Sequence, residues 1–258
     1  MTATIAAIAS CLGPAARRFD IDVLDSCDST NAVLLARAEA GAPSGTVVIA
    51  NEQTAGRGRR GRSWFANPGD SLTFSLLWRF PAGTAPAGLS LAVGLAVARA
   101  LAGMGGDGIL LKWPNDILRN GRKLGGILIE LVPGAPHAAV IGIGLNLQLP
   151  AAMPAELREV SAALCEQGPA ADENALYAGL LGELLRVLEA FAGSGFAPLR
   201  DEWMRRNAHA DSGVQLLSDF GAARSGICRG VDTDGALLFE ADGRVERILS
   251  GEVSLRPA

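Results

Sequence analysis

The sequence has 258 residues, of which 49% are hydrophobic and 19% charged, as in a folded globular protein rather than a disordered chain. A net charge of −4 argues against a surface built for nucleic acid, and the longest apolar run, at residues 89–104, is too short to cross a membrane and contains Arg99. No basic residue precedes the apolar start, which argues against a secretory signal and predicts a cytoplasmic protein with reduced cysteines.

Helices and strands are predicted in mixed order up to about residue 210. Asp28-Ser29-Thr30-Asn31 before an apolar run is typical of a capped helix start, with Gly41 as its stop. The pair Asn120-Gly121 predicts a hairpin turn that joins strands at residues 109–113 and 124–131. The other expected strands cover residues 46–50, 71–78 and 139–147, and the other expected helices cover residues 89–101, 174–191 and 196–206.

The pattern changes from about Gly213 onward. Short strands are expected at residues 214–217, 226–231, 236–239, 244–249 and 253–255, with Asp-Gly turns at Asp234-Gly235 and Asp242-Gly243. Strands so closely spaced favour a small barrel over part of a larger sheet. We therefore predict an α+β domain over residues 1–210, followed by a small β-barrel domain over residues 211–258.

A loop rich in arginine and glycine lies between two of the predicted strands. Residues 56–61 read GRGRRG and match the dinucleotide fingerprint letter for letter, but that fingerprint must lead into a helix, and here a strand follows. Glycine backbone and arginine side chains suit an anion, so we expect a loop that is mobile when empty and ordered by bound negative charge. A solvated basic loop and an RNA-binding segment, with Trp64 and Phe65 stacking on bases, remain as alternatives.

Side chains that act as nucleophiles are scarce. The two histidines, His137 and His209, have ordinary surroundings, and the four cysteines are too far apart to suggest a zinc site or a disulfide framework. Lysine is also rare, because only Lys112 and Lys123 occur among 23 basic residues, and both lie in one short block. A lysine ammonium is a compact charge on a flexible stem, so this block is a candidate site for binding phosphate or carboxylate.

Several blocks together resemble the biotin–protein ligase family. They are STN at residues 29–31, EQTAGRGRRGRSW at 52–64, KWPND at 112–116, RKLGGILIE at 122–130, VIGIGLN at 140–146 and GEVSLR at 251–256. The resemblance implies a class II synthetase-like catalytic domain, with a mixed sheet flanked by helices, and a C-terminal SH3-like barrel. Only 28 residues precede Ser29, too few for the winged-helix DNA-binding domain of longer members, so a short form without a DNA partner is expected.

The family's reaction uses ATP and Mg²⁺ to convert biotin to biotinyl-5'-AMP, and then transfers biotin to a lysine of the biotin carboxyl carrier domain of a carboxylase. Neither step needs a protein nucleophile, which agrees with the scarcity of histidine and cysteine. The alternatives are a lipoate or octanoyl ligase of the related fold and, in a different class, a nucleic-acid-binding module. The arginine loop argues against the first alternative, and the KWPND block is unexplained by the second.

The resemblance also implies roles for individual residues. Polar groups for the ureido ring of biotin come from Ser29, Thr30, Asn31 and Gln53, although Ser29-Thr30-Asn31 also fits plain helix capping. Arg57, Gly58 and Arg59 close over biotin, Lys123 bridges its carboxylate and the α-phosphate, and Gly126 permits close approach or marks a strand bulge. Lys123, Arg57 and Arg59 are the predicted catalytic residues. ATP is expected to contact Arg62, Trp64, Lys112, Asn115 and Asp116, and Asp116 is the candidate Mg²⁺ ligand, directly or through water.

Overall fold

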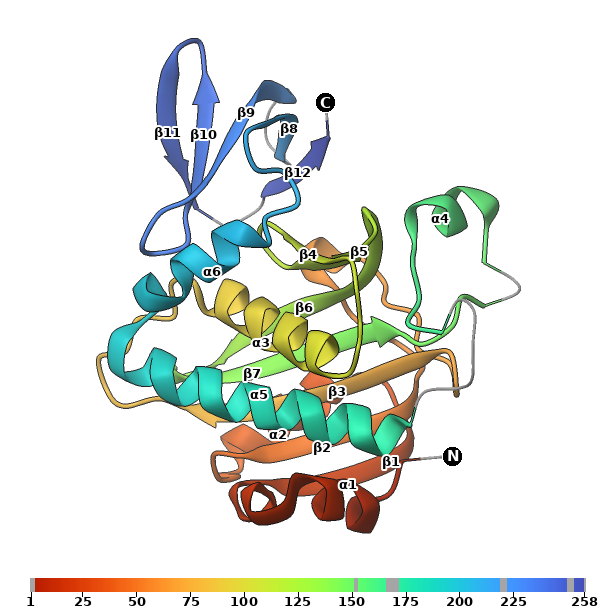
Figure 1. The fold of residues 1–258 in the computed structure, drawn as a ribbon. Helices are drawn as coiled ribbons and strands as arrows, with labels where there is room; N and C mark the ends of the chain where they lie inside the picture. The colour runs from red at the N-terminus through yellow and green to blue at the C-terminus, as the bar shows by residue number, and fades with distance from the viewer. Residues whose placement is uncertain (1–2, 151–152, 166–171, 219–221, 250–252, 258) are drawn as a thin grey trace.

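The computed structural model describes residues 3–150, 153–165, 172–218, 222–249 and 253–257 (Figure 1). Its centre is a seven-stranded mixed sheet in the order β1-β2-β3-β7-β6-β5-β4. The strands are β1 (Asp20–Cys27), β2 (Thr46–Gln53), β3 (Ser71–Arg79), β4 (Ile109–Lys112), β5 (Asp116–Arg119), β6 (Arg122–Val132) and β7 (Ala135–Asn146). β1 and β2 are parallel, and every other neighbouring pair in this sheet is antiparallel.

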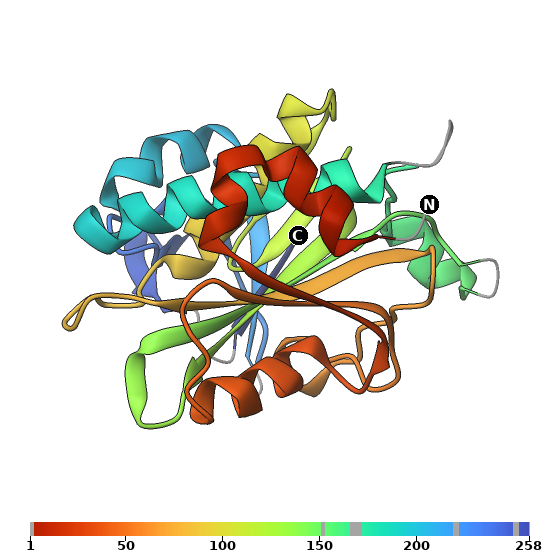
Figure 2. The same cartoon turned by 90° about the horizontal axis from the view of Figure 1, so that it is seen from below.

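Helices cover both faces of the sheet, as Figure 2 shows. One face carries α1 (Ile5–Leu12), α3 (Leu89–Gly103) and α5 (Glu173–Ser194), while α2 (Thr30–Glu39) packs on the other. The short helices α4 (Ala155–Val160) and α6 (Arg200–Arg205) lie at the margins. This mixed sheet between helices confirms the predicted α+β class. None of the helices in the described residues is long and apolar enough to span a membrane.

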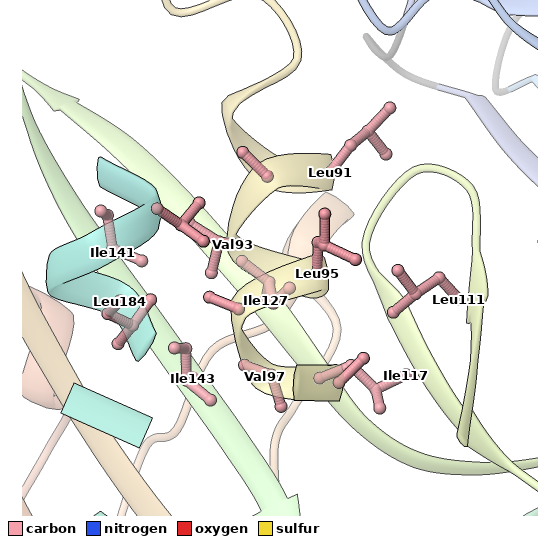
Figure 3. Packing of buried hydrophobic residues seen from close by; sticks show 14 of the residues in the cluster. Leu91, Val93, Leu95, Val97, Leu111, Ile117, Ile127, Ile141, Ile143 and Leu184 are labelled. Carbon is pink, nitrogen blue, oxygen red and sulfur yellow. The ribbon is translucent and has the colours of Figure 1, made fainter. Parts of the chain in front are cut away.

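The main core lies between the sheet and the layer of α3 and α5. Leu91, Val93, Leu95 and Val97 of α3 belong to one buried cluster with Ile127, Ile141 and Ile143 of the sheet and Leu184 of α5 (Figure 3). Burial of one such side chain contributes roughly 1.5–3 kcal/mol to the free energy of unfolding. This layer therefore holds the central strands rigidly, and their opposite face is left free to carry polar groups.

Strand β3 shows how the sequence separates these two faces. Leu72, Phe74, Leu76 and Trp78 belong to the main core, whereas Ser71, Thr73 and Ser75 alternate with them. Successive side chains of a strand point to opposite faces, so the three hydroxyl groups share the face on which α2 packs. Strand β3, buried in all but its last residue, thus presents polar groups on one face of the sheet.

The C-terminal part forms a second, antiparallel sheet of five strands in the order β11-β10-β9-β8-β12. Its strands are β8 (Ser212–Ser218), β9 (Arg224–Val231), β10 (Leu237–Ala241), β11 (Arg244–Ile248) and β12 (Val253–Pro257). It contacts the first part through Trp113, whose Nε1 donates to the Gly235 carbonyl at 3.1 Å. The division into domains at residue 210 remains a prediction.

Some predicted elements differ from the structure. The Asn120-Gly121 turn is present, with positive φ at both residues, but it joins β5 to β6 instead of β4 to β6. The chain reverses between β4 and β5 at Trp113-Pro114-Asn115, and the four-residue β5 that follows is too short for a pattern to reveal. α1, β1 and α4 were not predicted, because β1 carries Asp20, Asp22 and Asp25, a residue type that is depleted in strands, and the two helices are short.

Candidate functional site

A cleft opens on the polar face of the central strands. Its walls come from the start of α2, the arginine loop, the turn between β4 and β5, and β12. All fourteen predicted site residues line this one cleft: Ser29, Thr30, Asn31, Gln53, Arg57, Gly58, Arg59, Arg62, Trp64, Lys112, Asn115, Asp116, Lys123 and Gly126. Blocks that are far apart in the sequence therefore meet at a single place.

Glycines in the floor of the cleft leave room for the Trp64 indole to lie directly on the sheet. Thr73 of β3, Gly144 of β7, Gly126 of β6 and Asp116 of β5 are direct partners across the sheet, and they form one straight row. A Cβ on Gly144 would lie 2.4 Å from the Trp64 indole, so a side chain here would expel that ring. Side chains are absent from the middle of this row so that other groups can lie directly on the sheet.

One end of the cleft is lined by neutral polar groups. Gln53 Oε1 accepts from the Thr30 amide at 2.7 Å and from the Thr30 hydroxyl at 3.0 Å. Within the described residues, Gln53 Nε2 and the Ser29 hydroxyl make no hydrogen bond of their own, and both residues line the cleft. Ser29 is the N-cap residue of α2 but makes no side-chain cap bond, so capping does not use its hydroxyl. This end can offer both donors and acceptors to a neutral heterocycle.

Asn31 is held from two sides. Its Oδ1 accepts from the Ser75 hydroxyl at 2.5 Å, and its Nδ2 donates to Glu130 Oε2 at 2.7 Å. The same Glu130 oxygen lies 3.7 Å from Nη2 of Arg57. Most of the hydrogen-bonding capacity of Asn31 is thus used within the protein. Through Glu130, Asn31 connects the neutral polar end of the cleft to the arginine loop. The family resemblance implies a direct contact between Asn31 and the ureido ring of biotin, and this contact remains a proposal.

The opposite end carries a cluster of charges. Asp116 accepts from Lys123 Nζ at 2.6 Å through Oδ1 and from Lys112 Nζ at 2.8 Å through Oδ2. Burial alone would raise the pKa of Asp116, but the two ammonium groups outweigh it and hold the pKa below its ordinary value. The carboxylate therefore stays ionised at neutral pH and holds both lysines of the chain, with Lys123 beside Gly126 in the glycine row.

The arginine loop folds over the cleft as a hairpin-like turn. Isolated bridges join Gln53 to Ala66 and Arg57 to Ser63, and the Gly58 amide donates to the Arg62 carbonyl at 2.7 Å. Arg59 Nη1 donates to Asn115 Oδ1 at 3.1 Å, and burial lowers the pKa of this guanidinium. The loop returns to β3 and not to a long helix, in agreement with the rejection of a dinucleotide fingerprint.

Comparison with known proteins extends this picture. The model of the biotin/lipoate A/B protein ligase family matches residues 23–146, and that of the biotin protein ligase C terminal domain matches residues 212–256. The bifunctional ligase/repressor BirA of Escherichia coli is 41% identical over 92% of this chain and 74% of its own length. The chain belongs to the biotin protein ligase family. The predicted resemblance is thereby confirmed.

For two other family members, the match spans a larger share of the relative's own length. The biotin--[acetyl-CoA-carboxylase] ligase of Mycobacterium tuberculosis is 36% identical over 90% of this chain and 88% of its own length. The biotin protein ligase from Aquifex aeolicus in complex with biotin and ATP has a TM-score of 0.80 and 29% identity, and the match covers 93% of this chain and 99% of that one. The predicted fold is therefore the fold of this family.

Four residues that shape the cleft of this family member have no role predicted from the sequence: Thr73, Ser75, Gly142 and Glu130. The alternation of Ser71, Thr73 and Ser75 inside an apolar strand was the available signal for two of them. Glu130 and Gly142 lay within the quoted motifs but had no role assigned. Of the C-terminal motif, Gly251 and Glu252 lie outside the described residues, whereas Val253, Ser254, Leu255 and Arg256 line the cleft.

Replacing Ser75 by alanine is expected to lower the free energy of unfolding by about 1–3 kcal/mol, because Asn31 Oδ1 would lose its donor in a buried place. Urea denaturation of the free protein measures this loss. Ser90→Ala is the matched control, since the Ser90 hydroxyl donates to the Pro114 carbonyl at 3.0 Å at a half-buried site. Equal, small losses of unfolding free energy in both variants would show that the Ser75 hydrogen bond contributes no more than the half-buried one of Ser90.

Proposed function

We propose that this protein activates biotin with ATP to biotinyl-5'-AMP, releases pyrophosphate, and then transfers biotin to a lysine of a biotin carboxyl carrier domain. The observation that carries this proposal is one cleft with a neutral polar end and a cationic end, joined by a floor of glycines on which the Trp64 indole lies. Biotin has the same division, with a neutral ureido ring at one end and a carboxylate at the other. A cytoplasmic location is part of the same proposal, because the reaction consumes ATP.

The first step requires two anions that repel each other to come into line. The biotin carboxylate attacks the α-phosphorus of ATP, a new P–O bond forms, and the bond to the pyrophosphate leaving group breaks. The enzyme must supply positive charge and alignment rather than a nucleophile. Lys123 and Lys112 lie ready for this, because Asp116 holds both ammonium groups at one end of the cleft.

Retention of the intermediate fits the arginine loop. Arg59 lines the cleft and donates to Asn115, so the loop is tied to the turn between β4 and β5. In the second step the neutral ε-amine of the acceptor lysine attacks the acyl carbon of the mixed anhydride, AMP leaves, and the proton of the new amide nitrogen is lost to solvent. A closed loop would keep water away from this reactive acyl group until the acceptor arrives.

Asp116 is a poor direct ligand for Mg²⁺ in this arrangement. Both of its oxygens accept from lysine ammonium groups, so a metal ion would have to displace one of them. Across the described residues, no three His, Cys, Asp or Glu side chains are grouped in a way that could hold a metal ion. The residues present do not fit a protein-held Mg²⁺. The Mg²⁺ expected from the sequence fits better as an ion coordinated by the ATP phosphates.

Pyrophosphate exchange into ATP tests the proposal. With biotin and Mg²⁺ present, the purified protein is expected to incorporate labelled pyrophosphate into ATP, because adenylate formation is reversible. Parallel reactions with lipoate and with no acid are expected to remain at background. Exchange that depends on lipoate instead, or that needs no acid, would contradict the proposal. Incubation with a carrier domain and its Lys→Arg variant then tests the transfer step, and only the lysine form should become biotinylated.

A further inference from the structure

Two polar atoms in the floor of the cleft have no partner. Thr73 is only 3% exposed, and its Oγ1 makes no hydrogen bond to any residue that the structure describes. The Trp64 Nε1 atom is also buried, and it makes no hydrogen bond to any of the described residues. A buried hydroxyl without a partner costs roughly 1–3 kcal/mol, so native proteins rarely leave one unless another molecule completes it.

The two atoms lie at the same point of the sheet. Gly144 is the direct partner of Thr73 across β3 and β7, and the Trp64 Nε1 atom lies 2.7 Å from the position that a Cβ on Gly144 would take. Both residues line the cleft. Thr73 points to the polar face, since it alternates with Leu72 and Phe74 of the main core. The unpartnered hydroxyl therefore belongs to the floor of the site and not to the core.

Position along the sheet favours one end of the cleft. Ser75, which binds Asn31, lies on the same face two residues further along β3, about 7 Å from Thr73 by the rise of a strand. Asp116 and its lysines lie three strands away in the same row, at about 14 Å by the usual strand spacing. Thr73 is thus a neighbour of the neutral polar end.

We propose that the Thr73 hydroxyl hydrogen-bonds the biotin part of the ligand, beyond the residues that the family motifs mark. This inference rests on the proposed function. A threonine hydroxyl can both donate and accept, so it can meet a polar atom of the bicyclic ring or of its side chain. Binding relieves the unpartnered hydroxyl as it forms the new bond, and both effects favour the bound state.

The substitution Thr73→Val tests this, because valine has nearly the shape of threonine and lacks the hydroxyl. Biotin affinity, measured by calorimetry without ATP, is expected to fall about tenfold, in line with the loss of one buried hydrogen bond. The melting temperature of the free variant is expected to equal or exceed that of the wild type, since the unpartnered group is gone. Thr73→Ser keeps the hydroxyl and is expected to retain most of the affinity.

Thr46→Val is the matched control. Thr46 is equally buried at 3% exposure, but its hydroxyl donates to the Pro43 carbonyl at 2.8 Å, and it does not line the cleft. This variant is expected to lose stability and keep its biotin affinity. Wild-type affinity in Thr73→Val, whether or not ATP binding changes, would overturn the inference while leaving the proposed function intact. A wild-type protein that binds no biotin would instead overturn the proposed function.

Discussion

The substitution Lys123→Ala is expected to lower biotin-dependent pyrophosphate exchange by about 100-fold or more, while biotin affinity falls by less than about fivefold. Lys123 Nζ lies 2.6 Å from Asp116 and beside Gly126, at the cationic end of the cleft and away from the neutral polar end. Its charge is most useful when negative charge builds up between carboxylate and phosphate, and much less so when biotin alone is bound. Exchange kinetics and calorimetry on the same preparation measure the two quantities.

Lys123→Arg sharpens this test because it preserves the positive charge. A planar guanidinium cannot follow the moving charge as a flexible ammonium does, so exchange is expected to remain well below that of the wild type. Urea denaturation of both variants reports any general damage, since Asp116 keeps Lys112 as a partner in each. Comparable losses in biotin affinity and in exchange would show that Lys123 acts only in ground-state binding.

The substitution Arg59→Ala is expected to shorten the time that biotinyl-5'-AMP stays bound by about tenfold or more, because a half-buried, charge-assisted hydrogen bond is lost from the closed loop. Arg59 Nη1 donates to Asn115 Oδ1 at 3.1 Å and thereby joins the loop to the turn beneath it. A rapid-dilution assay of the preformed complex gives the half-life. Free adenylate would then acylate lysines of unrelated proteins, which a blot for biotin detects.

Arg186→Ala serves as the control for this variant. Arg186 is an exposed residue of α5 that pairs with Glu183 of the same helix. Its removal is expected to leave both the half-life and the labelling pattern unchanged, because exposed ion pairs contribute little. An Arg59→Ala protein that holds the intermediate as long as the wild type would show that the loop closes by other contacts.

Much of the site could be predicted, since its chemistry lies in local motifs. The arginine loop, the KWPND block and the two lysines were recognised as residue types that suit anions, and all of them line the cleft. The unpredicted parts have a common cause. β1 carries three aspartates, and β5 has only four residues, so neither has a periodic pattern from which to recognise it.

Thr73 and the pairing of Asp116 illustrate the remaining limit. In the sequence Thr73 is one polar residue in an apolar strand, and only the register of β3 against β7 places it opposite Gly144 and below Trp64. Asp116 reads as a metal ligand until the hairpin of β5 and β6 brings Lys123 to it from seven residues away. Such contacts depend on strand register, which is set by pairing across the sheet.

The amino-acid sequence alone determined the α+β class, the family and the set of residues that can bind anions, because helical and strand periodicity and short motifs are local properties. The tertiary structure decided which partners these residues have. Asn31 hydrogen-bonds Ser75 and Glu130, both lysines pair with Asp116, and the Thr73 hydroxyl has no partner among the described residues. The reason is physical, since partner choice depends on distances between strands and loops that only the packed core fixes.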